Sequence, residues 1–304
     1  MKTINTLTKD GLLIYHPKDG VTVRFNRNET SALLKQNIPW DTLDDHCELI
    51  HINVTNKCQM EPRCYGCYAQ HGKKFMSVKD FKNIIDKCIK YGVHSVTLGG
   101  GEPLLHPKLK SIVKYAADRI NIGVTTNGLN LRKLNVKTLK RFRQINISYH
   151  GNLSHVASCL LYLKRNNIKN GINYVYNTDT KDIVNALGGL CDTYKAELLM
   201  LQYKPVINDW DKYISPEETY AKAKEIKYLY NIDVAVDGGC ALKCMQKIRF
   251  LTVGINGDVY PCSFIHEPSM GNILKSDIPS IWKSRGPQII CPYLKKDDQL
   301  KLNK

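Results

Sequence analysis

The stretch that decides the fold is ELIHINVTNKCQMEPRCYGCYAQHG, residues 48–72. Its first seven residues form an apolar, β-branched run, which predicts a buried strand. The strand runs into a loop with three cysteines at spacings of five and two: Cys58, Cys64 and Cys67. A strand that brings closely spaced thiols into one loop predicts a functional site at its carboxyl end.

A buried strand followed by an amphipathic helix recurs six times between residues 48 and 230. Continuous apolar strands that alternate with such helices predict a parallel sheet covered by helices. The sheet is expected either to stay open and doubly wound or to curl like a barrel. In both architectures ligands bind at the carboxyl ends of the strands.

Glycine and polar residues gather at these predicted strand ends. They are Gly99-Gly100-Gly101-Glu102-Pro103, Thr125-Thr126-Asn127-Gly128, Ser148-Tyr149-His150-Gly151, Asn177 and Gln202-Tyr203. Because the carboxyl ends of parallel strands share one edge of the sheet, we expect these groups to lie around the cysteine loop.

Two smaller regions flank the repeated units. In residues 1–47, two strand-like runs surround Lys18-Asp19-Gly20 and predict a hairpin, with a short helix after it. In residues 231–304, Asn256-Gly257 predicts a second hairpin with a type I′ turn. We therefore expect three parts, at 1–47, 48–230 and 231–304.

The composition is that of a globular protein, with 304 residues of which 43% are hydrophobic. No apolar run approaches the roughly 18 residues that span a bilayer, and the N-terminus lacks a signal-peptide pattern. These features predict a cytoplasmic protein without a membrane partner. Thiols stay reduced there, so the eleven cysteines favour metal or redox roles over disulfides.

The net charge is +16, from 44 basic and 28 acidic residues. Many of the lysines fall on predicted helices, where they are typical of solvated outer faces. The same charge would also attract an acidic partner, either a nucleic acid or an acidic peptide. Charge alone does not choose between these interpretations, and it does not exclude nucleic acid.

Three close thiols are compatible with two kinds of metal site. A structural zinc ion takes four ligands, and His71 is available as the fourth. An iron–sulfur cube held by three cysteines keeps one iron open for another ligand. The tail carries Cys240, Cys244, Cys262 and Cys291, whose four thiols fit either one cube or a zinc ribbon.

The combination of motifs resembles the radical S-adenosylmethionine enzymes. The matching features are the cysteine triplet after the first strand, GGEP at 100–103, TTNG at 125–128 and INISYHG at 145–151. The sequence departs from the usual pattern in its first cysteine gap, which is five residues instead of three. It also has Gly66 where an aromatic residue usually precedes the last cysteine. The fold that this resemblance implies is a partial (β/α)6 TIM-like barrel.

The resemblance implies that Cys58, Cys64 and Cys67 hold a [4Fe–4S] cluster whose open iron binds S-adenosylmethionine. It implies that the Glu102 carboxylate faces the methionyl ammonium. The implied cofactor contacts are Tyr68, Gly100, Gly101, Glu102, Pro103, Asn127, Ser148, Asn177 and Gln202. It assigns no catalytic residue in this chain.

The tail resembles the twitch and SPASM extensions of this family. The matching features are Cys244, Gly257, Cys262, Gly271-Asn272-Ile273 and Trp282. A single later cysteine favours the shorter, twitch type with one auxiliary [4Fe–4S] cluster. The implied ligands are Cys240, Cys244, Cys262 and Cys291.

The resemblance implies an enzyme that reductively cleaves S-adenosylmethionine, with flavodoxin or ferredoxin as the reductant. The leading hypothesis is a maturase that modifies a ribosomally made peptide or protein. A biosynthetic enzyme for a small molecule, nucleotide or cofactor is the enzymatic alternative. A non-enzymatic zinc or iron–sulfur RNA-binding protein is the alternative from another class.

Overall fold

The computed structural model describes residues 2–237, 249–284, 291–293 and 295. Its central feature is a ten-stranded sheet of order β10-β9-β8-β7-β6-β5-β4-β11-β12-β13. The strands from β4 to β10 are parallel neighbours: β4 (Leu49–Thr55), β5 (Ser95–Gly100), β6 (Asn121–Thr126), β7 (Gln144–Ser148), β8 (Asn170–Tyr176), β9 (Glu197–Gln202) and β10 (Val234–Val236).

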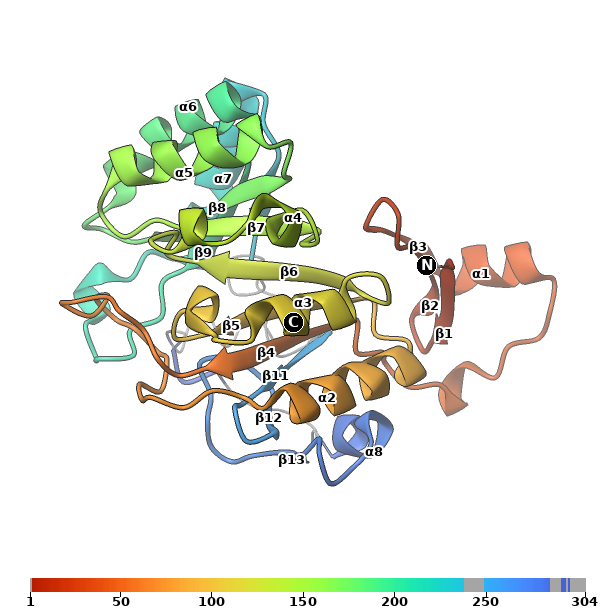
Figure 1. The fold of residues 1–304 in the computed structure, drawn as a ribbon. Helices are drawn as coiled ribbons and strands as arrows, with labels where there is room; N and C mark the ends of the chain where they lie inside the picture. Colours follow the sequence, from red (N-terminus) through yellow and green to blue (C-terminus); the bar gives the residue numbers. More distant parts are fainter. Residues whose placement is uncertain (1, 238–248, 285–290, 294, 296–304) are drawn as a thin grey trace.

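Six helices follow β4 to β9 in turn and cover the outer face of the sheet (Figure 1). They are α2 (Val78–Tyr91), α3 (Leu109–Ala116), α4 (Val136–Leu139), α5 (Leu153–Arg165), α6 (Val184–Tyr194) and α7 (Pro216–Tyr230). Their boundaries follow local chemistry. The Ser77 hydroxyl accepts a hydrogen bond from Asp80 N at 3.0 Å, and Gly92 ends α2 in the left-handed conformation. Ser215 caps α7 in the same way. The six predicted β/α units are confirmed.

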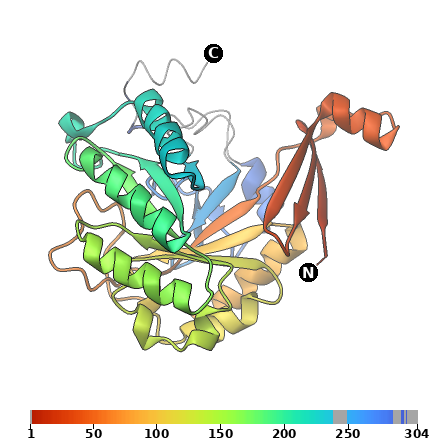
Figure 2. The same ribbon diagram turned by 90° about the horizontal axis from the view of Figure 1, so that it is seen from above.

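The two faces of the sheet differ in chemistry. On β4, Ile50, Ile52 and Val54 are fully buried against the helices, while His51 and Asn53 lie on the opposite, inner face. Seen from above, the strands curve around this inner face without closing (Figure 2). The partial barrel that the sequence predicted is therefore confirmed.

The inner face is polar. Asn146 Nδ2 donates to Asn173 Oδ1 at 2.8 Å, and Asn173 Nδ2 donates to Thr125 Oγ1 at 3.2 Å. A cavity of about 250 Å³ lies beside this network, lined among others by Thr97 and Gln144. The interior of a closed (β/α)8 barrel is packed with branched aliphatic side chains instead. This lumen is thus equipped to bind a polar ligand.

The N-terminal element is a three-stranded antiparallel sheet, β1 (Ile4–Thr8), β2 (Gly11–His16) and β3 (Val21–Asn26), followed by α1 (Arg27–Leu34). The predicted hairpin and helix are present. The sequence prediction missed β1, because its five residues INTLT are too short and too polar to stand out.

A buried carboxylate joins this element to the rest of the protein. Glu48, just before β4, accepts two hydrogen bonds from Arg24 of β3, at 2.8 and 2.7 Å, and one from Arg249 at 2.8 Å. Burial raises the pKa of Glu48, but the two arginines outweigh burial and hold this pKa below its ordinary value. Beside it, Tyr15 of β2 stacks on His94 with ring centroids 4.4 Å apart.

The tail continues the sheet. It contains β11 (Phe250–Val253), β12 (Asp258–Tyr260), β13 (Gly271–Asn272) and α8 (Ile278–Lys283), and β11 pairs in parallel with β4. The hairpin between β11 and β12 is confirmed, but its predicted type I′ turn is wrong. Within this turn, Gly257 has a positive φ of 87° and Asn256 does not have a positive φ. Gly257 N donates to Gly254 O, so an ordinary turn is followed by one left-handed glycine.

None of the described helices combines the length and the apolar character needed to cross a bilayer.

His94 yields a prediction about stability and pH. Its ring is 3% exposed, and neither nitrogen has a hydrogen-bond partner among the described residues. Burial lowers the pKa of His94 from 6.5 to about 4, although nearby Glu48 opposes this shift. The folded state therefore resists protonation, and its stability falls as pH drops from 6.5 toward 4.

We expect His94→Phe to keep the stack on Tyr15 and to remove this pH dependence. Between pH 7 and pH 5 the parent should lose about 2 kcal/mol more unfolding free energy than the variant. Urea denaturation at both pH values measures the difference. Equal losses in the two proteins would contradict the assignment.

Candidate active site

Residues 56–72 form a loop that is closed at its base. The Thr55 hydroxyl donates to Lys74 O at 2.9 Å, and Gly72 N donates to Asn56 O at 2.9 Å. The loop projects beyond the carboxyl ends of β4 and β6 (Figure 1). Cys58, Cys64 and Cys67 therefore lie at the strand ends, where the sequence placed them.

Three glycines at the end of β5 pack directly against β4 and the start of this loop. A Cβ atom at Gly99 would overlap the His51 ring, one at Gly100 would overlap Thr55 O, and one at Gly101 would overlap Lys57 O. In addition, Gly101 N donates to Thr55 O at 2.8 Å, and Glu102 N donates to Lys57 O at 2.7 Å. The glycines are required for this backbone contact, whatever they also contribute to cofactor binding.

The Glu102 side chain is buried, with 1% exposed, and faces the protein itself. Oε1 accepts from Leu104 N at 3.0 Å and from Thr126 Oγ1 at 2.6 Å, and Oε2 accepts from Asn127 N at 2.8 Å. Burial raises the pKa of Glu102, while these three hydrogen bonds oppose the shift. The carboxylate thus ties the end of β5 to the end of β6. Its contact with an ammonium group stays a prediction.

The loop extends across the rim to β6, β7 and the segment after β9. Cys58 Sγ lies 4.0 Å from Asn127 Nδ2, and Cys64 Sγ lies 3.8 Å from His150 Nε2. The Tyr65 hydroxyl donates to Asp209 Oδ2 at 2.6 Å. The loop is therefore held on both sides of the rim.

The chemistry of the three thiols fits an iron–sulfur cluster. Burial, together with smaller contributions from the neighbouring Cys67 and Cys58, raises the pKa of Cys64 to about 11. The three groups are thus within electrostatic reach of one another, and a cationic cluster would offset the charge of their thiolates. Within the described part of the chain, no three His, Cys, Asp or Glu side chains converge as ligands of a single ion. His71 Nε2 nevertheless lies 3.3 Å from Cys67 Sγ.

The other predicted cofactor contacts differ in whether their side chains already have hydrogen-bond partners within the protein. Asn177 Oδ1 accepts from Thr180 N at 3.0 Å, so it caps its own turn. Gln202 Nε2 donates to Ile214 O at 2.6 Å, while Gln202 Oε1 is buried without a partner among the described residues. Ser148 is half-buried at the end of β7, and Pro103 is buried at the first turn after Glu102. Their contacts with the cofactor stay predictions.

Tyr68 faces the tail. Its ring centroid lies 4.2 Å from that of Phe264, and burial raises the pKa of Tyr68 to about 12, with smaller contributions from Cys67 and Cys262. Tyr68 therefore lies between the cysteine loop and the tail cysteines, and its predicted contact with the cofactor is untested.

Two of the four predicted tail ligands are described, and they are neighbours. Cys262 and Cys291 are 8% and 4% exposed. Burial raises the pKa of Cys262, and the nearby Cys291 raises it further. The chain thus folds back after α8 as the sequence predicted. Cys240 and Cys244 lie outside the described residues.

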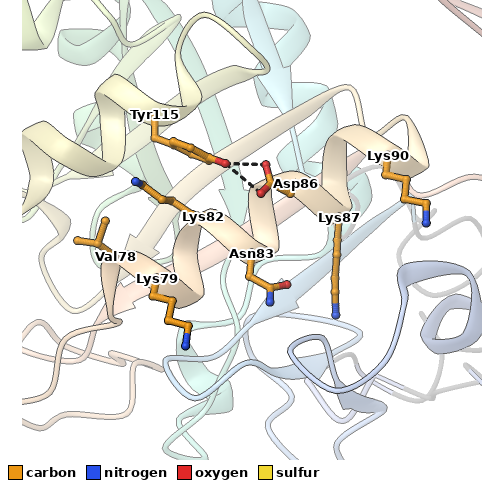
Figure 3. A pocket seen from close by; sticks show the side chains of 8 residues that line it. All are labelled: Val78, Lys79, Lys82, Asn83, Asp86, Lys87, Lys90 and Tyr115. Carbon is orange, nitrogen blue, oxygen red and sulfur yellow. Dashed lines mark hydrogen bonds between the residues drawn. The ribbon is translucent and has the colours of Figure 1, made fainter.

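A separate groove lies apart from this site. It has a volume of about 720 Å³ on the outside of α2, and lysines line it together with Asp86 and Tyr115, which hydrogen-bond to each other (Figure 3). No cysteine and no rim residue contributes to it. The candidate active site is the rim and lumen of the barrel.

Sequence reasoning missed His51. Its Nδ1 lies 2.7 Å from Ser263 Oγ, and this contact links the inner face of β4 to the residue after Cys262. Burial lowers the pKa of His51 to about 4, which keeps the ring neutral. The available signal was the alternation of His51 and Asn53 with apolar residues inside a predicted buried strand.

Family models match both cysteine regions. The radical SAM superfamily matches residues 52–178, and the SPASM iron–sulfur cluster-binding domain matches residues 244–300. The chain thus carries the domain pair of a radical S-adenosylmethionine enzyme with a SPASM-type extension. The two matches imply a [4Fe–4S] cluster with S-adenosylmethionine at the loop and an auxiliary iron–sulfur cluster in the tail.

Several of the similar curated sequences are named as GTP 3′,8-cyclases. A probable GTP 3′,8-cyclase of Methanococcus maripaludis is 33% identical over 89 residues, which are 27% of this chain and 29% of that protein. A GTP 3′,8-cyclase of Clostridium perfringens is 26% identical over 183 residues, 52% of this chain and 56% of that protein. The matches thus span at most about half the length of these relatives.

The similar solved structures confirm the fold. Streptococcus suis SuiB bound to its precursor peptide SuiA has a TM-score of 0.72 and 15% identity, covering 92% of this chain and 87% of that one. The anSMEcpe structure with bound AdoMet has a TM-score of 0.59 and 16% identity, covering 78% of this chain and 80% of that one.

The glycine contact yields a prediction about the first cluster. Gly101→Ala should displace the start of the loop, and the anaerobically reconstituted protein should lose about half of its iron, one cube of two. Gly189→Ala is the control, since a Cβ there meets only ordinary contacts. Full iron content in Gly101→Ala would show that the contact does not order the loop.

Proposed function

We propose that this protein reductively cleaves S-adenosylmethionine and modifies a ribosomally made peptide. A [4Fe–4S] cluster held by Cys58, Cys64 and Cys67, with bound S-adenosylmethionine, would supply the radical chemistry needed to remove a hydrogen atom from an unactivated carbon. The protein supplies position and protection from water. The backbone N–H groups of Gly101 and Glu102 fix the start of the loop to the end of β5, and Tyr65 fixes its far side to Asp209.

The observation that supports a peptide substrate is the free edge of the N-terminal sheet. The order β1-β2-β3 leaves β3 without a second neighbour among the described strands. Its side chains Val21 and Val23 are 50% and 39% exposed. An unpaired strand with exposed apolar side chains can accept an extended peptide as an additional strand.

The position of this sheet constrains the substrate. It lies near the amino ends of the barrel strands, at the opposite end from the cysteine loop (Figure 1). A strand rises about 3.3 Å per residue, so a six-residue barrel strand spans roughly 20 Å. The peptide therefore needs at least about six residues between the part that pairs with β3 and the part that is modified. A net charge of +16 suits an acidic leader segment.

The second candidate is a nucleotide substrate. Its support is the sequence similarity to GTP 3′,8-cyclases and the amide-rich lumen, where Asn146 and Gln144 lie beside the cavity. Flavodoxin or ferredoxin would supply the electron in both cases.

Substitution of the β3 edge tests the peptide proposal. Where the genome encodes a short peptide next to this protein, we expect the double variant Val21→Asp/Val23→Asp to bind that peptide at least tenfold more weakly than the parent. Leu229→Asp, at an exposed position on α7, is the control. Fluorescence anisotropy measures binding, and mass spectrometry measures modification.

Dithionite-driven cleavage of S-adenosylmethionine should be equal in the three proteins. If the parent converts GTP and leaves this peptide unmodified, the nucleotide candidate replaces this one.

The two cysteine sets should have separable effects. We expect Cys67→Ala to abolish release of 5′-deoxyadenosine under dithionite, because the first cube loses a ligand. Cys262→Ala should retain this release and lose peptide modification. Chromatography of 5′-deoxyadenosine with and without peptide provides the readout. If Cys262→Ala stops cleavage completely while the first cluster stays intact, the assignment of separate roles to the two cysteine sets is wrong.

A further inference from the structure

Lys204, two residues after β9, is a buried cation. It is 5% exposed, although lysine is rarely buried without a charged partner. Its Nζ lies 3.8 Å from Asp237 Oδ2 and donates to Gln202 O at 3.4 Å. It also lies 6.0 Å from the ring centroid of Phe264. The ammonium is thus held in place between the end of the barrel and the tail.

The two described tail cysteines, Cys262 and Cys291, lie near the Lys204 ammonium. Phe264 N donates to Cys262 Sγ at 3.5 Å, so the ring that Lys204 approaches belongs to the turn that carries this thiol. Tyr293, two residues after Cys291, places its ring centroid 6.2 Å from that of Phe264. Lys204 opposes the burial that raises the pKa of Cys262 and Cys291, so its charge reaches both sulfur atoms.

The charges at this spot have opposite signs. Lys204 contributes one positive charge, and Asp237, with a side chain 23% exposed, contributes one negative charge. Reduction of an iron–sulfur cluster adds one negative charge, and nearby charges act strongly on it because a buried site screens them weakly.

We propose that the buried ammonium of Lys204 raises the reduction potential of the auxiliary cluster held by Cys262 and Cys291, and that Asp237 lowers it. This proposal rests on the cluster content of the family and is independent of the peptide substrate. A higher potential makes the auxiliary cluster a better electron acceptor. Lys204 is therefore a charge-setting residue of the tail site, distinct from the ligands.

A redox titration monitored by electron paramagnetic resonance tests the proposal without any substrate. Lys204→Met keeps much of the side chain's length and removes its charge, Lys204→Arg keeps the charge, and Asp237→Asn removes the opposing charge. Lys195→Met is the matched control, because the Lys195 side chain is 75% exposed and pairs with Asp192 at the surface. Iron and sulfide analysis accompanies each titration.

We expect Lys204→Met to shift the midpoint of one cluster to a more negative potential and Asp237→Asn to shift the same midpoint to a more positive one. Lys204→Arg and Lys195→Met should titrate like the parent. Repeating Lys204→Met in a protein without Cys58, Cys64 and Cys67 should show the same shift, which assigns it to the tail cluster. A fully loaded Lys204→Met protein with both midpoints unchanged would overturn the proposal.

If Lys204→Met loses the tail cluster altogether, the arginine variant shows whether the charge or the packing of Lys204 is responsible. If Lys204→Arg keeps the cluster and its midpoint, the charge is what the site requires, and the proposal stands. If Lys204→Arg loses the cluster as well, Lys204 acts through packing, and the proposal is wrong.

Discussion

The candidate active site depends on a contact between two backbones. The end of β5 lies so close to the end of β4 that a side chain at Gly99, Gly100 or Gly101 would overlap its neighbour. Two hydrogen bonds, from Gly101 N and Glu102 N, fix the first residues of the cysteine loop in that position. Because these donors are main-chain groups directly after the buried strand β5, the loop starts from a rigid base. Everything farther along the loop, including the contact of Tyr65 with Asp209, depends on this base.

Much of this arrangement could be predicted from the sequence, because its signals are local. The alternation of strands and helices, the cap at Ser77 and the glycines after the second strand are each encoded within a few residues. The partners of Glu102 could not be predicted in the same way. Its place after the glycines pointed to a ligand, but its hydrogen bonds go to Thr126 and Asn127 on the next strand. The same holds for Lys204, whose neighbours come from β9, the end of β10 and the tail.

The tail is part of the same sheet as the barrel. β11 extends the parallel sheet beside β4, Glu48 binds Arg249, and Trp282 Nε1 donates to Asp45 O at 2.9 Å. Tyr68 and Phe264 add a contact at the carboxyl end. Cys262, two residues after β12, is therefore held relative to the cysteine loop by the continuous sheet. The sheet thus fixes the separation between the cysteine loop and this part of the tail.

The polar lumen has a consequence for how this protein can change over generations. Most of the hydrophobic stabilisation of the sheet comes from its outer layer, where residues such as Ile50, Phe81 and Ile112 are fully buried. The inner face, with Asn146 and Thr125, contributes hydrogen bonds whose net effect on stability is small. Substitutions in the lumen should therefore be tolerated far better than substitutions in the outer layer. Evolution can therefore change the substrate through substitutions in the lumen, while the scaffold and the cysteine loop stay the same.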